Sequence, residues 1–174
     1  MPVRRAVLAG LALLAAGSAA SAPALPPAAD QSAHPGWPAR EEPEIRAVTE
    51  AFRKAVIARD GAAISDLMLD SRATFNLIGT QDAIDENRKF DRHYTGLGAS
   101  GFGAFSRFIT ASKVPVEERF RNLRIEQDGP LALVAFDYEF VADGKVENAG
   151  LEHWMLRKVD GRWKIFSVVW TERP

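Results

Sequence analysis

The chain contains no cysteine among its 174 residues. This absence excludes disulfide bonds, a cysteine nucleophile, a thiolate metal site and a lipid anchor on cysteine. The folded protein must therefore be stabilised by packing and hydrogen bonds alone. Without the export segment described next, about 150 residues remain, which is enough for one domain with a full hydrophobic core.

A long apolar run is also lacking. The most apolar stretch, Ala6–Ala16, is shorter than the roughly 20 residues that a membrane-spanning helix needs. It follows two arginines and precedes small residues, which is the pattern of a signal peptide over residues 1–22. Cleavage after Ala20 or Ala22 fits this pattern, and we favour Ala20 because Pro23 would be a poor first residue. We expect a periplasmic or secreted protein without membrane insertion after cleavage, with a membrane anchor as the alternative.

Neither sign of charge dominates the chain. There are 22 Lys and Arg against 23 Asp and Glu, and loss of the two signal-segment arginines takes the net charge from −1 to about −3. This balance gives no electrostatic basis for binding nucleic acid or an anionic membrane. We therefore expect neither as a partner.

Residues 23–42 are rich in proline and alanine and have almost no periodic apolar pattern. Such a composition is typical of a disordered or extended leader. The sequence thus divides into a signal peptide (1–22), a leader (23–42) and one folded domain (43–174).

The folded domain begins with helical patterns. Pro43 occupies a first-turn position, and Asp60 can cap a second short helix. A strand is expected over residues 72–79, a long charged loop over 80–100, and a third helix after it. The apolar residues that define the three helices are Ile45, Val48, Phe52, Ala55 and Val56; Ile64, Leu67 and Met68; and Phe102, Phe105, Phe108 and Ile109.

The segment 116–171 predicts four consecutive strands, separated by turns at 127–130, 142–144 and 160–161. At least two of these strands carry apolar side chains on both faces, so both faces of the sheet need a cover. Helices followed by an antiparallel meander indicate an α+β fold.

The hairpin Asp160-Gly161 followed by Trp163 and Ile165 is the most specific motif in the chain. With the order of elements, it resembles the nuclear transport factor 2-like superfamily, also called SnoaL-like or cystatin-like, over roughly residues 44–171. The resemblance implies N-terminal helices packed on a strongly curved, mostly antiparallel sheet that forms a cone with a pocket. It also implies a homodimer through the outer sheet face. It does not fix a function, since the superfamily includes isomerases, dehydratases, cyclases, epoxide hydrolases and binding proteins.

Periodicity alone leaves open which sheet face lines the pocket, because a shift of one residue exchanges the faces. Relatives place ligand contacts at the positions that correspond to Trp154 and Trp170. With strict alternation along the strands, the residues then expected to line the pocket are Phe136, Tyr138, Glu152, Trp154, Phe166 and Trp170.

Glu152 is the first candidate for catalysis. In SnoaL-like cyclases an acid lies three residues before the arginine that corresponds to Arg157, but here that position holds Trp154. Glu152 is the nearest substitute on the same predicted face, and burial among aromatic rings would raise its pKa toward neutrality. The alternative is a glutamate at the mouth of the cone, solvated or paired with an arginine.

His93 is the second candidate, in the long charged loop with Asp91 and Tyr94. A loop folded over the pocket would let His93 act as an acid or base; the alternative is a solvated polar loop. His153 is expected on the outer sheet face.

No metal or cofactor is predicted. The three histidines share no helical face and no His-Glu-x-x-His motif occurs. Residues 96–101 match the letters of the dinucleotide fingerprint, but they follow a charged segment instead of a buried strand. The sequence favours a domain that binds a small, mostly apolar or aromatic molecule without a cofactor. A cofactor-independent isomerase, dehydratase or cyclase that uses Glu152 or His93 is the alternative, and an interaction domain with a collapsed core is a third possibility.

Overall fold

A computed structural model describes residues 41–173. The predicted signal peptide, its cleavage site and nearly all of the predicted leader lie outside the described residues. No helix within residues 41–173 combines the length and apolar character needed to cross a membrane.

The expected opening helices are confirmed. Helix α1 (Glu42–Ala58) has Pro43 in its first turn, buries one apolar stripe and ends at Arg59, whose φ is 55°. Helix α2 (Gly61–Leu67) begins at Asp60, whose side chain accepts a hydrogen bond from the Ala63 N–H. Helix α4 (Phe102–Ala111) corresponds to the third expected helix. A Cβ atom on Gly61 would lie 2.4 Å from the Thr110 hydroxyl of α4, so glycine is needed for α2 and α4 to pack this closely.

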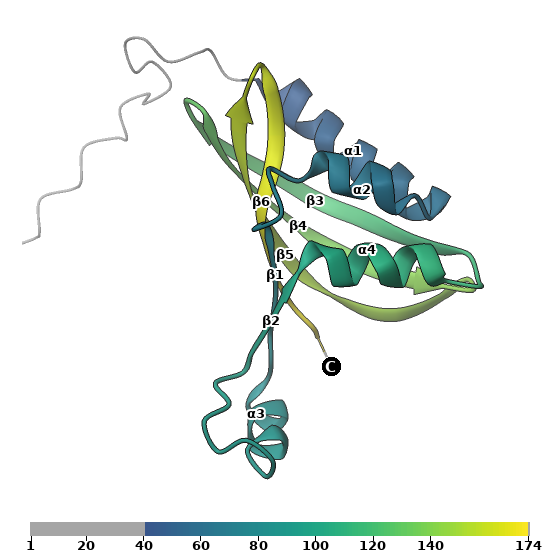
Figure 1. The fold of residues 1–174 in the computed structure, drawn as a ribbon, viewed down its shortest axis with the longest axis vertical. Coiled ribbons are helices and arrows are strands. Elements are labelled where there is room, and N and C mark those ends of the chain that lie inside the picture. Colours follow the sequence, from purple (N-terminus) through teal and green to yellow (C-terminus); the bar gives the residue numbers. More distant parts are fainter. Residues whose placement is uncertain (1–40, 174) are drawn as a thin grey trace, which may run out of the picture. The chain divides into compact units, whose positions relative to one another are not determined.

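The sheet has six strands in the order β2-β1-β6-β5-β4-β3 and is not closed. Every neighbouring pair is antiparallel except β1 and β6. Figure 1 shows the strong curvature of the long strands, with α1 and α4 beside them. This arrangement confirms the predicted α+β fold. The strands are β1 (Thr74–Ile78), β2 (Leu97–Gly101), β3 (Val116–Asp128), β4 (Leu131–Ala142), β5 (Lys145–Val159) and β6 (Arg162–Thr171).

The segment predicted as a long loop contains regular structure. Helix α3 (Gln81–Asn87) begins after Thr80, whose hydroxyl accepts from the Ala83 N–H. A side-chain hydrogen bond of 2.8 Å from Gln81 to Asp85 joins successive turns. The helix buries no residue, so it has no apolar stripe from which it could be predicted.

The Asp160-Gly161 turn is confirmed. Both residues have positive φ, 49° and 74°, as a tight two-residue hairpin requires. Beside the turn, the Trp163 indole N–H donates to the Glu41 carboxylate over 2.9 Å, and Lys158 forms an ion pair with the same carboxylate. These contacts attach the start of α1 to the last hairpin.

Two irregularities in the register change which face a side chain occupies. Between β5 and β6 the pairing shifts so that Met155 opposes Ser167 while Leu156 opposes Ile165, which leaves Phe166 as an extra residue. Strict alternation through β6 was therefore wrong, because the extra residue shifts the alternation: Ile165 before the bulge and Val168 after it are both fully buried although they are three residues apart. A second shift between β4 and β5 leaves Glu147 as the extra residue.

The core lies between the inner sheet face and the helices. Trp154 is fully buried at its centre, with its ring 4.9 Å from that of Phe52 on α1 and 5.1 Å from that of Phe136 on β4. Aromatic pairs of this kind contribute about 0.5–1.5 kcal/mol each beyond the burial of their area. The Phe52 ring of this cluster also lines a cavity between the sheet and the helices.

Candidate functional site

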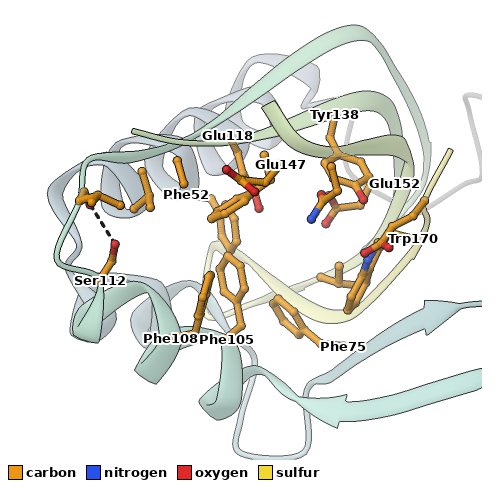
Figure 2. A pocket seen from close by; sticks show the side chains of 17 residues that line it. Phe52, Phe75, Phe105, Phe108, Ser112, Glu118, Tyr138, Glu147, Glu152 and Trp170 are labelled. Atoms are coloured by element: carbon orange, nitrogen blue, oxygen red, sulfur yellow. Dashed lines mark hydrogen bonds between the residues drawn. The ribbon is translucent and has the colours of Figure 1, made fainter. Parts of the chain in front are cut away.

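A cavity of about 470 Å³ lies between the inner sheet face and the helices α1 and α4. In Figure 2 the labelled glutamates and Tyr138 come from the long strands on one side, and Phe105 and Phe108 come from a helix on the other. Its lining contains seven aromatic side chains and four glutamates. The aromatic residues are Phe52, Phe75, Phe105, Phe108, Tyr138, Phe140 and Trp170; the glutamates are Glu118, Glu147, Glu152 and Glu172.

Strand pairing brings two of these glutamates into the interior. Glu118 on β3 lies opposite Phe140 on β4, and Glu152 on β5 lies opposite Phe136 on β4. Both side chains share the inward face with apolar neighbours, and each residue is only 6% exposed. A carboxyl group in such a place loses most of its hydration, which disfavours its charged form.

The two carboxyl groups differ in their hydrogen bonds. The Trp154 indole N–H donates to Oε1 of Glu152 over 2.7 Å. Oε2 of Glu118 is buried and has no hydrogen-bond partner among the described residues. Since buried polar atoms are nearly always paired, this oxygen needs an explanation.

Burial raises both pKa values. For Glu118, burial and then the nearby Glu152 carboxylate raise the pKa well above its usual range. For Glu152, burial raises the pKa to about 7, while the hydrogen bond from Trp154 opposes the rise. The direction of the shift favours the protonated form of Glu118, whereas a pKa of about 7 leaves Glu152 close to half ionised at neutral pH. Two buried carboxyl groups with raised pKa values therefore line one cavity.

Tyr138 lies in the same cavity. Its hydroxyl donates to the backbone oxygen of Thr171 over 3.3 Å, and burial, together with the nearby glutamates, raises its pKa. Gly150 makes this contact possible, because a Cβ atom there would lie 1.8 Å from the same oxygen. Tyr138 therefore remains a neutral phenol whose oxygen can still accept a hydrogen bond.

The residues predicted to line the pocket divide into three groups. Tyr138, Glu152 and Trp170 do line the cavity. Phe136 and Trp154 share their face but are fully buried beneath it, in the core. Phe166 is not among the lining residues. It is the extra residue at the bulge, so its side chain does not follow the alternation of Val168 and Trp170. A role of these residues in ligand binding stays a prediction.

The alternative interpretation of Glu152 as a solvated or arginine-paired glutamate does not agree with the structure. The residue is buried, and no ion pair within residues 41–173 includes it.

His93 is not brought to the cavity. It is exposed between α3 and β2, where Arg92 donates to its Nε2 and its own N–H donates to Asp91, each over 2.9 Å. It does not line the cavity with Glu152. The structure thus agrees with the alternative interpretation, in which His93 belongs to a solvated polar segment.

Sequence reasoning missed Glu118. The signal was present, since alternation through Val116, Glu118 and Phe120 places one acid between two apolar residues on a single face. Phe52 and Phe105 were predicted only as core-facing helix residues, and both also line the cavity.

We found no group of three His, Asp or Glu side chains within residues 41–173 that could hold a metal ion. The cavity lining contains no lysine, arginine or histidine. The chemistry available there comes from carboxyl groups, a phenol and aromatic rings.

Comparison of the structure with solved proteins identifies the fold. A nuclear transport factor 2-like protein from Shewanella baltica matches with a TM-score of 0.56 at 18% identity, over 77% of this chain and 94% of its own. The chain has the nuclear transport factor 2-like fold. A nuclear transport factor 2-like protein with a cystatin-like fold from Novosphingobium aromaticivorans has a TM-score of 0.56 at 12% identity, over 76% of this chain and 81% of its own.

A third structure with the nuclear transport factor 2-like fold is a proposed dehydratase from Streptomyces avermitilis. Its TM-score is 0.55 at 14% identity, over 76% of this chain and 95% of its own. No family model and no curated protein matches the sequence. The resemblance predicted from the Asp160-Gly161 hairpin is confirmed at the level of the fold.

Proposed function

We propose that this chain binds a small, mostly apolar molecule in the aromatic-lined cavity, without a cofactor. The observation that carries the proposal is a cavity of about 470 Å³ between sheet and helices, lined by seven aromatic side chains. Ligand sites of small molecules are typically concave, apolar and equipped with a few polar groups that orient the ligand. Trp170 lines the cavity and is only partly buried, which supports a role in contacting the ligand.

Native mass spectrometry of the protein purified from its own host tests this function, because a retained ligand would add its mass to the chain. Trp170→Ala should lose the added mass. Phe90→Ala is the matched control, since Phe90 is 88% exposed and does not line the cavity. A wild-type protein without added mass, together with the absence of binding by the probes described below, would contradict the proposal.

A second function is favoured by the two buried glutamates. In a dehydration, Glu152 as carboxylate would take a proton from carbon while protonated Glu118 gave its proton to the departing hydroxyl, which leaves as water. The pKa shifts support this assignment of roles, since burial favours a protonated Glu118 and a pKa of about 7 leaves part of Glu152 ionised at neutral pH. The Streptomyces avermitilis protein, a proposed dehydratase, is similar in fold. Isomerisation by the same proton transfers is the related possibility.

Substitution of Glu152 tests whether the chain is an enzyme. Once a turnover is found, Glu152→Gln should lower kcat by about 10²–10⁴-fold, the usual contribution of a positioned acid or base. His93→Gln should leave it unchanged, because His93 lies away from the cavity. A catalytic role of Glu152 is wrong if Glu152→Gln retains full turnover.

We also propose export of the chain to the periplasm or the outside of the cell, on the basis of the signal-peptide pattern over residues 1–22. Cell fractionation followed by N-terminal sequencing tests this. With cleavage after Ala20, the exported protein should begin at Ser21. Recovery of the uncleaved chain only in the cytoplasm would contradict it.

A further inference from the structure

The charged residue types that line the cavity are all acidic. Four glutamates line it, and no lysine, arginine or histidine does. Some acids on other surfaces of the same sheet do have basic partners; Glu139, for example, pairs with Arg121 over 3.2 Å. None of the four cavity glutamates forms an ion pair with any residue between 41 and 173. The described part of the chain therefore supplies no basic side chain to pair with these carboxyl groups.

Glu118 is more direct evidence for a ligand. The residue is 6% exposed, lines the cavity, and its Oε2 has no hydrogen-bond partner among the described residues. In Figure 2 its side chain reaches from the strand into the cavity. Because an unpaired buried polar atom is costly, a hydrogen-bond partner that enters the cavity would be favoured.

The other groups in the lining are suited to the same partner. Aromatic faces carry partial negative charge and attract cations. The Tyr138 hydroxyl uses its hydrogen on Thr171, so its oxygen is left as an acceptor. One oxygen of Glu152 accepts from Trp154, and the second is left for a donor from the ligand. Glu147 and Glu172 are exposed lining residues, and their charge would attract a cation toward the opening.

We propose that the molecule bound in this cavity carries a protonated primary or secondary amine on an apolar body. The inference rests on the proposed binding function and names the class of its ligand. The ammonium group donates to Glu118 Oε2 and to the second oxygen of Glu152. The apolar body packs against the phenylalanine rings of α1, α4 and β1. Among the described residues, these rings provide contact area without competing hydrogen bonds.

A neutral ligand with a carbonyl group is the competing class. Protonated Glu118 could donate to such a carbonyl, which would also explain its unpaired oxygen. It would not explain the exposed glutamates or the lack of any basic side chain in the lining. The amine accounts for all three observations.

Binding of an amine must displace protons, because the ammonium group needs ionised carboxylates. The titratable groups that line the cavity are Glu118 on β3, Tyr138 on β4, Glu147 and Glu152 on β5, and Glu172 after β6; α1, α4 and β1 contribute none. Below the raised pKa values, amine affinity should therefore increase with pH, by up to about tenfold per unit for each proton released. A neutral ligand should not gain affinity as pH rises.

Calorimetry with three shape-matched probes tests the inference: 4-phenylbutylamine, 4-phenylbutan-1-ol and 5-phenylpentanoate. At pH 8 the amine should bind at least about tenfold more tightly than the alcohol, and the acid should bind most weakly. The ratio of amine to alcohol affinity should shrink at pH 6. The same titrations in buffers with different ionisation enthalpies report proton release directly.

Glu118→Gln should weaken the amine about tenfold or more and leave the alcohol within about twofold. Glu126→Gln is the matched control, since Glu126 lies on the same strand but is exposed and away from the cavity. Glu152→Gln is a second variant, used in the same way if Glu118→Gln does not fold.

The possible results separate the two proposals. An alcohol that binds as tightly as the amine overturns the amine inference and leaves the binding function intact. Equal effects of Glu118→Gln and Glu126→Gln also overturn it. Failure of all three probes to bind counts against both the amine inference and the binding function.

Discussion

Trp154 donates its indole N–H to Oε1 of Glu152 over 2.7 Å, from a position two residues along the same face of β5. The two side chains are both buried, so this bond fixes the orientation of the carboxyl group at the cavity. Trp154 thus holds in place one of the two buried acids that line the cavity.

Replacement of this tryptophan should shift the titration of Glu152. Trp154→Phe removes the N–H that favours the ionised form, so the pKa of Glu152 should rise above about 7. Carboxyl ¹³C chemical shifts followed against pH measure it. Trp163→Phe is the control, because it removes an indole hydrogen bond to Glu41 instead. An unchanged or lower pKa in Trp154→Phe would show that this bond does not stabilise the carboxylate.

Stability should fall as pH rises from about 4.5 toward neutrality. Glu152 has a folded pKa near 7 against an ordinary value of 4.5, so between these values the folded state binds more protons than the unfolded state. Its contribution is fully present below pH 4.5 and is lost as pH passes through 7, a change of roughly 3 kcal/mol. Glu118, whose pKa burial also raises, acts in the same direction.

Urea unfolding at pH 5 and pH 8 measures this dependence. The double variant Glu118→Gln with Glu152→Gln should lose most of the difference between the two pH values, because neither amide titrates. Glu126→Gln should retain it. A wild-type protein more stable at pH 8 than at pH 5 would contradict the raised pKa values.

Gly150→Ala should destabilise the protein by about 1–3 kcal/mol or more, because its Cβ atom would lie 1.8 Å from the Thr171 backbone oxygen. The displaced backbone would also break the hydrogen bond from Tyr138. Gly103→Ala is the matched control, since its nearest neighbour is the end of the flexible Arg107 side chain at 3.4 Å. That change, inside α4, should be neutral or stabilising. Thermal unfolding of both variants tests the pair of expectations, and equal losses would refute the explanation.

Met155→Asp should convert a dimer into a monomer if two copies associate through the outer sheet face. Met155 is 39% exposed there and lies opposite Leu133, which is 36% exposed. A carboxylate in the middle of such a contact would be costly to bury. Sedimentation velocity measures the association state, with Phe90→Asp as a control on an exposed residue elsewhere. A wild-type protein that is monomeric at all concentrations would contradict the homodimer that the resemblance implies.

The main elements of the fold could be predicted because each has a local cause. The apolar stripe of α1, the Asp60 cap and the Asp160-Gly161 turn depend on residues close in sequence. Helix α3 could not be predicted from apolar periodicity, since it is stabilised by a cap and exposed side-chain hydrogen bonds.

The cavity was harder to predict than the fold. Alternation placed Tyr138, Glu152 and Trp170 correctly, but a bulge depends on how two strands pair and has no signature in one strand alone. Phe166 and Glu147 both lie at such bulges. Glu118 could have been found from its apolar neighbours, whereas its nearness to Glu152 depends on the pairing of β3, β4 and β5.

The parallel pairing of β1 with β6 has a consequence for how the chain is made. Thr74 meets Ser167, a residue 93 positions later, so β1 has no neighbour on that side until β6 has been synthesised. During translation β1 can pair only with β2 until β6 has been synthesised. Long-range contacts of this kind slow folding. We therefore expect the pairing of β1 with β6 to form late in folding.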